Sequence, residues 1–147
     1  MGKLSSFFGK IPFLSNIGSK KKSKKSNVEL QYDKAINLME NGNADEAVEI
    51  LEKIADIAIV DPTYKDFGVD SLKIMGELYE TGKYSNCSVS VDKNKATIYY
   101  EKYINLNKDG EMIYKLAKMF LEIQNFSKAI TFFEKATDCG IKAAYMN

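Results

Sequence analysis

The sequence contains no histidine and no arginine, so lysine supplies all 21 of its basic residues. Histidine is the usual general base and a common metal ligand, and its absence removes most triad and zinc chemistries. Sequence-specific reading of nucleic acid needs the planar arginine fork, so the lack of arginine argues against that function. We therefore predict no enzyme, no catalytic residue, no metal site and no cofactor. An enzyme built on a pair of carboxylates is the alternative that the composition leaves open.

Other features are scarce rather than absent. Two cysteines, Cys87 and Cys139, are too few for a disulfide framework in a chain of 147 residues, so we expect both to be free thiols. No spaced glycines with a following Lys-Ser/Thr form a phosphate-binding loop. No apolar run approaches the ~20 residues of a membrane-spanning helix. Cytoplasmic residence is the expectation, with a peripheral position at the inner face of a membrane as the alternative.

The net charge of +1 conceals two oppositely charged parts. Residues 1–27 carry seven lysines and no acid, whereas residues 28–147 carry 14 lysines and 20 acids, which gives +7 and −6. Such asymmetry is typical of a chain with a basic tail. We predict two segments: a basic leader at 1–27, amphipathic or disordered, and a folded domain at 28–147.

The folded domain contains a recurring motif in which a small residue and a large apolar residue are followed by Lys-Ala or Glu-Ala and more apolar residues. Its positions are Ala35, Leu38, Ala47 and Leu51, then Gly76, Tyr79, Ala96 and Tyr100, then Ala117, Phe120, Ala129 and Phe133. Apolar periodicity predicts three helix pairs, at about 28–41 with 44–58, 69–80 with 93–106, and 111–123 with 127–138. Asp92 and Asp109 are predicted N-caps, and 82–92 is predicted to be a polar loop. Repetition at this scale indicates stacked helical units.

The third unit resembles a tetratricopeptide repeat through Leu116, Ala117, Phe120, Ala129 and Phe133. The second unit is similar to the Sel-one-like branch, as shown by its Gly76-Glu77-Leu78-Tyr79, Asp92, Lys95-Ala96 and Tyr99-Tyr100. Tyr103 departs from that pattern, which usually has alanine there. The resemblance implies an all-α, right-handed α-solenoid of about three antiparallel helix hairpins. An unrelated helical bundle is the alternative.

The resemblance also implies a non-catalytic adaptor that binds a peptide or partner protein in a groove lined by the first helix of each pair. The implied groove residues are Glu29, Tyr32, Ile36, Met39, Asp70, Lys73, Glu77, Glu80, Glu111, Tyr114, Lys118 and Leu121. Five of these are acidic and two are basic, which favours a basic or amphipathic partner. Tyr32 and Tyr114 are the expected anchors, because aromatic side chains supply much of the energy of such interfaces. The alternative is a simply solvated helix face.

The leader suggests a second function, that of a peripheral membrane protein whose repeats serve assembly. Its candidate membrane residues are apolar Leu4, Phe7, Phe8, Ile11 and Leu14, and basic Lys20, Lys21, Lys22, Lys24 and Lys25. An apolar stripe beside a polybasic run is typical of segments that bind anionic membrane surfaces. The first six residues also fit the N-myristoylation pattern. A disordered leader that aids solubility is the alternative.

Both ends of the chain suggest further associations. We hypothesise that the basic leader folds back on the acidic groove and competes with the partner. Residues 141–147 resemble the start of a fourth hairpin, and an uncapped solenoid end leaves an apolar face uncovered. The sequence therefore predicts either self-association through the C-terminal end or a longer repeat protein of which this chain is a fragment.

Overall fold

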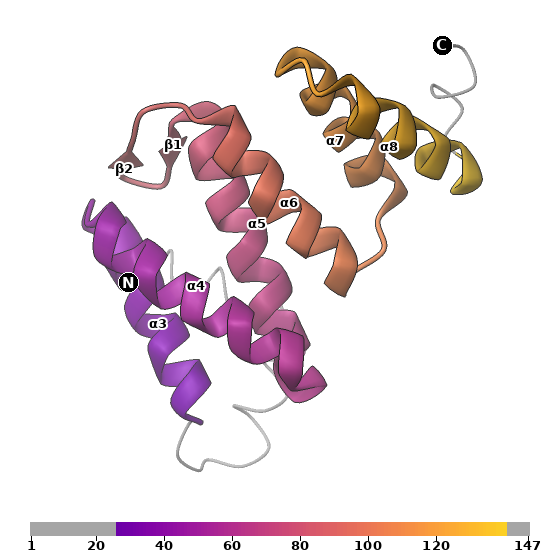
Figure 1. Cartoon of the computed structure of the whole chain (residues 1–147). Helices are drawn as coiled ribbons and strands as arrows, with labels where there is room; N and C mark the ends of the chain where they lie inside the picture. Colours follow the sequence, from indigo (N-terminus) through magenta and orange to yellow (C-terminus); the bar gives the residue numbers. More distant parts are fainter. Residues whose placement is uncertain (1–25, 141–147) are drawn as a thin grey trace. The chain divides into compact units, whose positions relative to one another are not determined.

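The computed structural model describes residues 26–140, and these form α-helices joined by short connections (Figure 1). The elements are α3 (Asn27–Glu40), α4 (Ala44–Val60), a 3-10 turn (Pro62–Tyr64), α5 (Lys65–Thr81), β1 (Lys83–Tyr84), β2 (Cys87–Ser88), α6 (Lys93–Leu106), α7 (Gly110–Glu122) and α8 (Phe126–Asp138). The prediction of an all-α chain of helix hairpins is confirmed. The membrane residues predicted in the leader and the predicted fourth hairpin lie outside the described residues.

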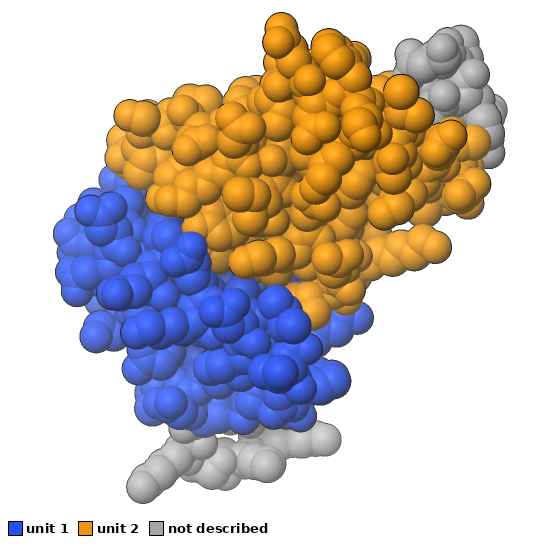
Figure 2. Space-filling view, in the orientation of Figure 1, with its two compact units in different colours: residues 1–71, 85–87 blue, residues 72–84, 88–147 orange. Residues whose placement is uncertain are grey.

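The chain divides into two compact units, coloured separately in Figure 2. The described part of unit 1 is 26–71 with 85–87, and that of unit 2 is 72–84 with 88–140. The division falls inside α5, whose first turns belong to unit 1 and whose remainder belongs to unit 2.

In unit 1, α3 and α4 pack as an antiparallel pair joined by the short turn at 41–43 (Figure 1). Ser26 and Glu29 begin α3 with a capping box, in which each side chain accepts a hydrogen bond from the backbone N–H of the other at 3.2 Å. The facing apolar residues of both helices are buried and form the core. They are Val28, Tyr32, Ala35, Ile36 and Met39 of α3, and Ala47, Val48, Leu51, Ile54, Ala55 and Ala58 of α4.

Helix α5 begins at Lys65, four residues before the predicted start at 69. Asp61 caps the preceding turn by accepting a hydrogen bond from Thr63 N at 3.0 Å, and Pro62 occupies the first position of that turn. Pro62 has the φ angle that a helical first turn requires, so this linker leads directly into the helix. Phe67, in the first turn of α5, is 3% exposed and belongs to the core.

The predicted polar loop at 82–92 contains a β-hairpin, formed by β1 and β2. Its tip contacts the C-terminal end of α3: Asn86 Nδ2 donates to the Glu40 carbonyl at 2.6 Å, and Cys87 Sγ donates to the Met39 carbonyl at 3.5 Å. The last carbonyls of a helix have no partner within the helix, and these contacts supply two. Gly42 has φ +82°, a left-handed conformation that favours glycine in the turn after α3. A Cβ at this position would lie 3.2 Å from the Asn86 carbonyl oxygen, so glycine also leaves room for the hairpin tip.

In unit 2, both predicted aspartate caps are confirmed. Asp92 accepts from Lys95 N at 3.0 Å to begin α6, and Asp109 accepts from Met112 N at 3.2 Å to begin α7. Helices α7 and α8 form an antiparallel pair (Figure 1), and Phe120 meets Phe132 edge-to-face with ring centroids 5.2 Å apart. Small residues at Ala117 and Ala129 are buried in this pair, as the motif predicts.

The turns of the first and third pairs repeat one backbone geometry. Gly42 and Gln124 have φ of +82° and +64°, and each precedes an asparagine N-cap. Those caps, Asn43 and Asn125, have nearly identical torsions of −93°, 74° and −92°, 76°. The sequence repeat is therefore also a structural repeat.

Two further predictions, on the cysteines and on membrane-spanning helices, can be compared with the described residues. Cys87 and Cys139 are both free thiols, as predicted. No helix between residues 26 and 140 combines the length and apolar character needed to cross a membrane.

Candidate functional site

The predicted groove residues of the first hairpin lie in the core of unit 1. Tyr32, Ile36 and Met39 are 0%, 6% and 1% exposed. The Tyr32 ring meets Phe67 edge-to-face at 5.4 Å, and its hydroxyl donates a hydrogen bond to Asp70 Oδ2. The first turns of α5 thus cover this face of α3, and in this structure these three side chains present no surface to a partner.

Two acidic residues predicted for the groove also have hydrogen-bond partners within unit 1. Glu29 is 9% exposed and serves the capping box of α3. Asp70 is half-buried and accepts the Tyr32 hydroxyl. Unit 1 therefore provides no open, acidic stretch of groove on α3.

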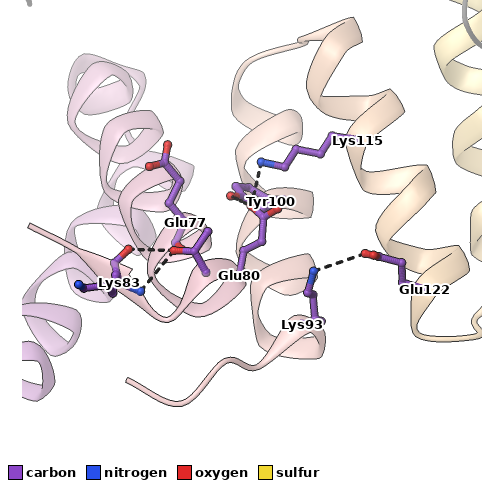
Figure 3. Close-up of polar contacts among 8 residues, drawn as sticks. Glu77, Glu80, Lys83, Lys93, Tyr100, Lys115 and Glu122 are labelled. Carbon is purple, nitrogen blue, oxygen red and sulfur yellow. Dashed lines mark hydrogen bonds and ion pairs between the residues drawn. The ribbon is translucent and has the colours of Figure 1, made fainter. Parts of the chain in front are cut away.

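In unit 2, Glu80 joins three helices (Figure 3). Its Oε1 accepts a hydrogen bond from the Tyr100 hydroxyl of α6 at 2.7 Å and lies 2.8 Å from Lys115 Nζ of α7. The Lys115 ammonium also lies over the Tyr100 ring, 5.1 Å from its centroid. We call Glu80, Tyr100 and Lys115 the clasp.

The clasp shifts the pKa values of Glu80 and Tyr100. Partial burial alone would raise the pKa of the Glu80 carboxyl, but hydrogen bonds from Lys115 and Tyr100 and the nearby lysine charges outweigh burial and lower it. Burial and the hydrogen bond to Glu80 raise the pKa of the Tyr100 phenol. Glu80 is therefore ionised and Tyr100 neutral at ordinary pH.

Further contacts hold the same three helices together. Tyr79 of α5 stacks on Tyr99 of α6 with centroids 5.9 Å apart, and Lys95 lies over the Tyr79 ring at 4.5 Å. Lys93 of α6 pairs with Glu122 of α7 at 3.5 Å (Figure 3). Both members of that pair are substantially exposed, so it adds little stability by itself.

The predicted groove residues of α7 lie on an accessible face. Glu111, Lys118 and Leu121 are exposed, and Tyr114 is half-buried. The Tyr114 ring meets the Phe133 ring of α8 edge-to-face, with centroids 5.8 Å apart. Lys118 Nζ lies 4.7 Å from the centroid of the Tyr114 ring. We call Glu111, Tyr114, Lys118 and Leu121 the α7 face. On α5, Lys73 is exposed and Glu77 is half-buried.

Sequence reasoning missed both the clasp and the hairpin contacts. Glu80 was interpreted as a groove residue because its position in the repeat suggested it, and its bonds depend on three helices that no local pattern relates. The capping box was also missed, although the Ser-x-x-Glu spacing of Ser26 and Glu29 is a signal that predicts it.

The described residues show little that resembles a catalytic or metal centre. Between residues 26 and 140, no group of three or more Cys, Asp or Glu side chains is arranged to hold a metal ion. Burial raises the pKa of the Cys87 thiol, which disfavours the reactive thiolate.

Comparison with known proteins gives a family model and one relative. The tetratricopeptide repeat model matches residues 110–138, which comprise α7 and α8. Mouse tetratricopeptide repeat protein 21B is 27% identical over 119 residues, covering 74% of this chain and 9% of that protein. This chain thus spans a small part of the length of that relative. No solved structure matches this chain.

Together with the helix pairs, these matches support a tetratricopeptide-like repeat protein. Repeats of this kind generally mediate protein–protein interaction. The matched residues contain the whole α7 face, so most of the exposed residues predicted for the groove lie in the repeat that the family model matches.

Proposed function

We propose that this chain is a non-catalytic adaptor that binds a peptide or partner protein through the α7 face. The similarity to tetratricopeptide repeats supports the class of function. The accessibility of the α7 face, compared with the burial of Tyr32, Ile36 and Met39, supports this location.

The observation that carries the proposal is the packing around the ring of Tyr114. Phe133 meets this ring edge-to-face and Lys118 Nζ lies over it, so these contacts already limit its rotamers and little freedom is lost when a partner packs there. Leu121, 49% exposed, lies two helical turns further along the same stripe and offers an aliphatic contact. Preorganised aromatic anchors with apolar neighbours are typical of interface hot spots.

The charges of unit 2 favour an amphipathic partner over a strongly basic one. Its described residues carry ten lysines and nine acids, and the α7 face itself carries Glu111 and Lys118. A partner that places an apolar side chain between Tyr114 and Leu121, flanked by charges of both signs, would match this face.

The Sel-one-like branch stays a prediction for the second pair. What supports it is the extended connection between α5 and α6, in which residues 82–92 include the β-hairpin. Cytoplasmic residence, too, stays a prediction.

Affinity measurements with matched variants of the full chain test this function. For any protein that binds the purified chain, we expect Tyr114→Ala and Leu121→Ser each to weaken binding about tenfold or more, as loss of an anchor does. Ile130→Ser is the control, because Ile130 is 61% exposed on α8 and lies outside the α7 face. Equal losses in Leu121→Ser and Ile130→Ser, or a loss in Ile130→Ser alone, would place the binding surface elsewhere.

A further inference from the structure

The acidic charge of the folded chain is concentrated in unit 1. Its described residues carry 11 acids and 3 lysines, a net of −8, whereas the described residues of unit 2 carry 9 acids and 10 lysines, a net of +1. Residues 1–25 carry seven lysines and no acid. The basic leader is therefore joined directly to the acidic unit.

The exposed acids of unit 1 form a stripe along α4. Asp45, Glu49, Glu52 and Asp56 are spaced by four, three and four residues, so they share one helical face, and all four are exposed. Ile59 and Val60 continue that face and are 52% and 82% exposed. We call these six residues the α4 face. It lies away from the core side of α4, which buries Leu51, Ile54 and Ala58.

Exposed apolar residues gather at the end of the α3–α4 pair where the leader joins. The two helices are antiparallel, and the 14 residues of α3 rise about 21 Å. Counting back from the turn, the start of α3 is therefore level with the last turns of α4. Leu30 of α3 is 53% exposed, and Ile57, Ile59 and Val60 of α4 are 37%, 52% and 82% exposed.

We propose that the occupant of the α4 face is residues 1–25 of the chain's own leader, the part that precedes the α3 cap at Ser26. Its lysines complement the acids of α4, and its apolar residues, Leu4, Phe7, Phe8, Ile11 and Leu14, complement Ile59 and Val60. Since the leader is covalently joined at Ser26, its effective concentration at this face is high.

The α4 face differs from the acidic groove on which the leader was expected to fold back. Of the groove acids, Glu29 serves the capping box, Asp70 accepts Tyr32 and Glu80 lies in the clasp. The acids of the α4 face extend along the exposed side of one helix. The α4 face shares no residue with the α7 face, so the inference does not depend on the proposed function.

Paramagnetic relaxation in the full chain tests this inference. A nitroxide label is attached at Ser15→Cys in a Cys139→Ser background, in which the remaining Cys87 is buried. At low ionic strength we expect the label to broaden the backbone amide signals of α4, most strongly near Asp56 and Val60. High salt should restore those signals, because it screens exposed charges.

Matched charge variants make the test specific. Glu49→Gln with Asp56→Asn should abolish the broadening, whereas Glu111→Gln with Glu134→Gln, which removes two exposed charges from unit 2, should leave it unchanged. Thermal unfolding of each variant confirms that the fold is intact.

Four results would overturn the inference. The first three are the absence of broadening in α4, the survival of the broadening in the α4 variant, and broadening centred on α7 instead of α4. The fourth is broadening in an isotope-labelled chain that is mixed with a separate nitroxide-labelled chain, because a second copy would then be the occupant. Binding of the leader to phosphatidylserine vesicles without any α4 broadening in their absence would make a membrane the occupant.

Discussion

The ring of Tyr100 lies against Gly76, so closely that a Cβ added at residue 76 would be 2.4 Å from Tyr100 Cε1. The missing side chain lets α6 approach α5, and the Tyr100 ring fills the space while its hydroxyl reaches Glu80. One glycine therefore determines both the packing of this pair and the geometry of the clasp.

We predict that Gly76→Ala destabilises the chain. Helix propensity alone favours alanine over glycine by about 1 kcal/mol, whereas overpacking of a buried site typically costs about 1–3 kcal/mol. The contact at 2.4 Å makes the steric cost dominant, so urea unfolding should show a lower free energy of unfolding. Combining Gly76→Ala with Tyr100→Leu should cost less than the sum of the two single changes. A Gly76→Ala chain more stable than wild type would contradict this packing.

The clasp predicts a loss of stability in acid. Because the pKa of Glu80 is lower in the folded chain than in the unfolded chain, its contribution is complete above the unfolded pKa, about 4.3, and is lost as pH falls through the folded pKa. The free energy of unfolding of wild type minus that of Glu80→Gln should therefore shrink as pH is lowered below about 5. A difference that stays constant down to pH 3 would show that Glu80 does not titrate as described.

The hydroxyl of Tyr100 should be separable from its ring. Tyr100→Phe keeps the packing against Gly76 but removes the hydrogen bond to Glu80, which should cost about 1 kcal/mol in urea unfolding. Glu101→Gln is a control on the same helix, since the Glu101 pair with Lys128 is more exposed to solvent and should contribute less. A larger cost for Glu101→Gln would argue against the clasp.

The two asparagine caps should differ in their contributions although their torsions match. The Asn125 side chain accepts a hydrogen bond from Lys128 N at 3.3 Å, whereas Asn43 makes no side-chain cap bond. We predict that Asn125→Ala lowers the free energy of unfolding by about 1 kcal/mol and that Asn43→Ala lowers it less. Equal costs would show that the backbone conformation, rather than the hydrogen bond, is what asparagine supplies.

Most of the fold was predictable because it depends on local patterns. Ala117 and Ala129 mark the close contacts of the third pair, and Asp92 and Asp109 mark helix starts that the structure confirms. The hairpin was not predictable, since its tip is held by the end of α3, a contact between Asn86 and Glu40 that are 46 residues apart.

The candidate site was predictable only in part, for a related reason. Position in the repeat assigned Tyr32 and Tyr114 equivalent roles, but each one's burial depends on what packs beside it. Phe67 and Asp70 contact Tyr32, whereas Tyr114 lies between Phe133 and Lys118 and stays half-buried. Phe67, Asp70 and Phe133 come from other helices than the tyrosine they contact, so these contacts cannot be inferred from the periodicity of one helix.

Site-specific photo-crosslinking in the cells that produce the full chain tests the central claim, that the α7 face binds a protein partner, most directly. A photoreactive amino acid is placed at Leu121 or at Ile130, which are both exposed but lie on different helices. The account predicts a discrete crosslinked partner from position 121 that is absent from position 130 and is lost when Tyr114→Ala is added. Crosslinks from position 130 alone, or the same products from both positions, would contradict it.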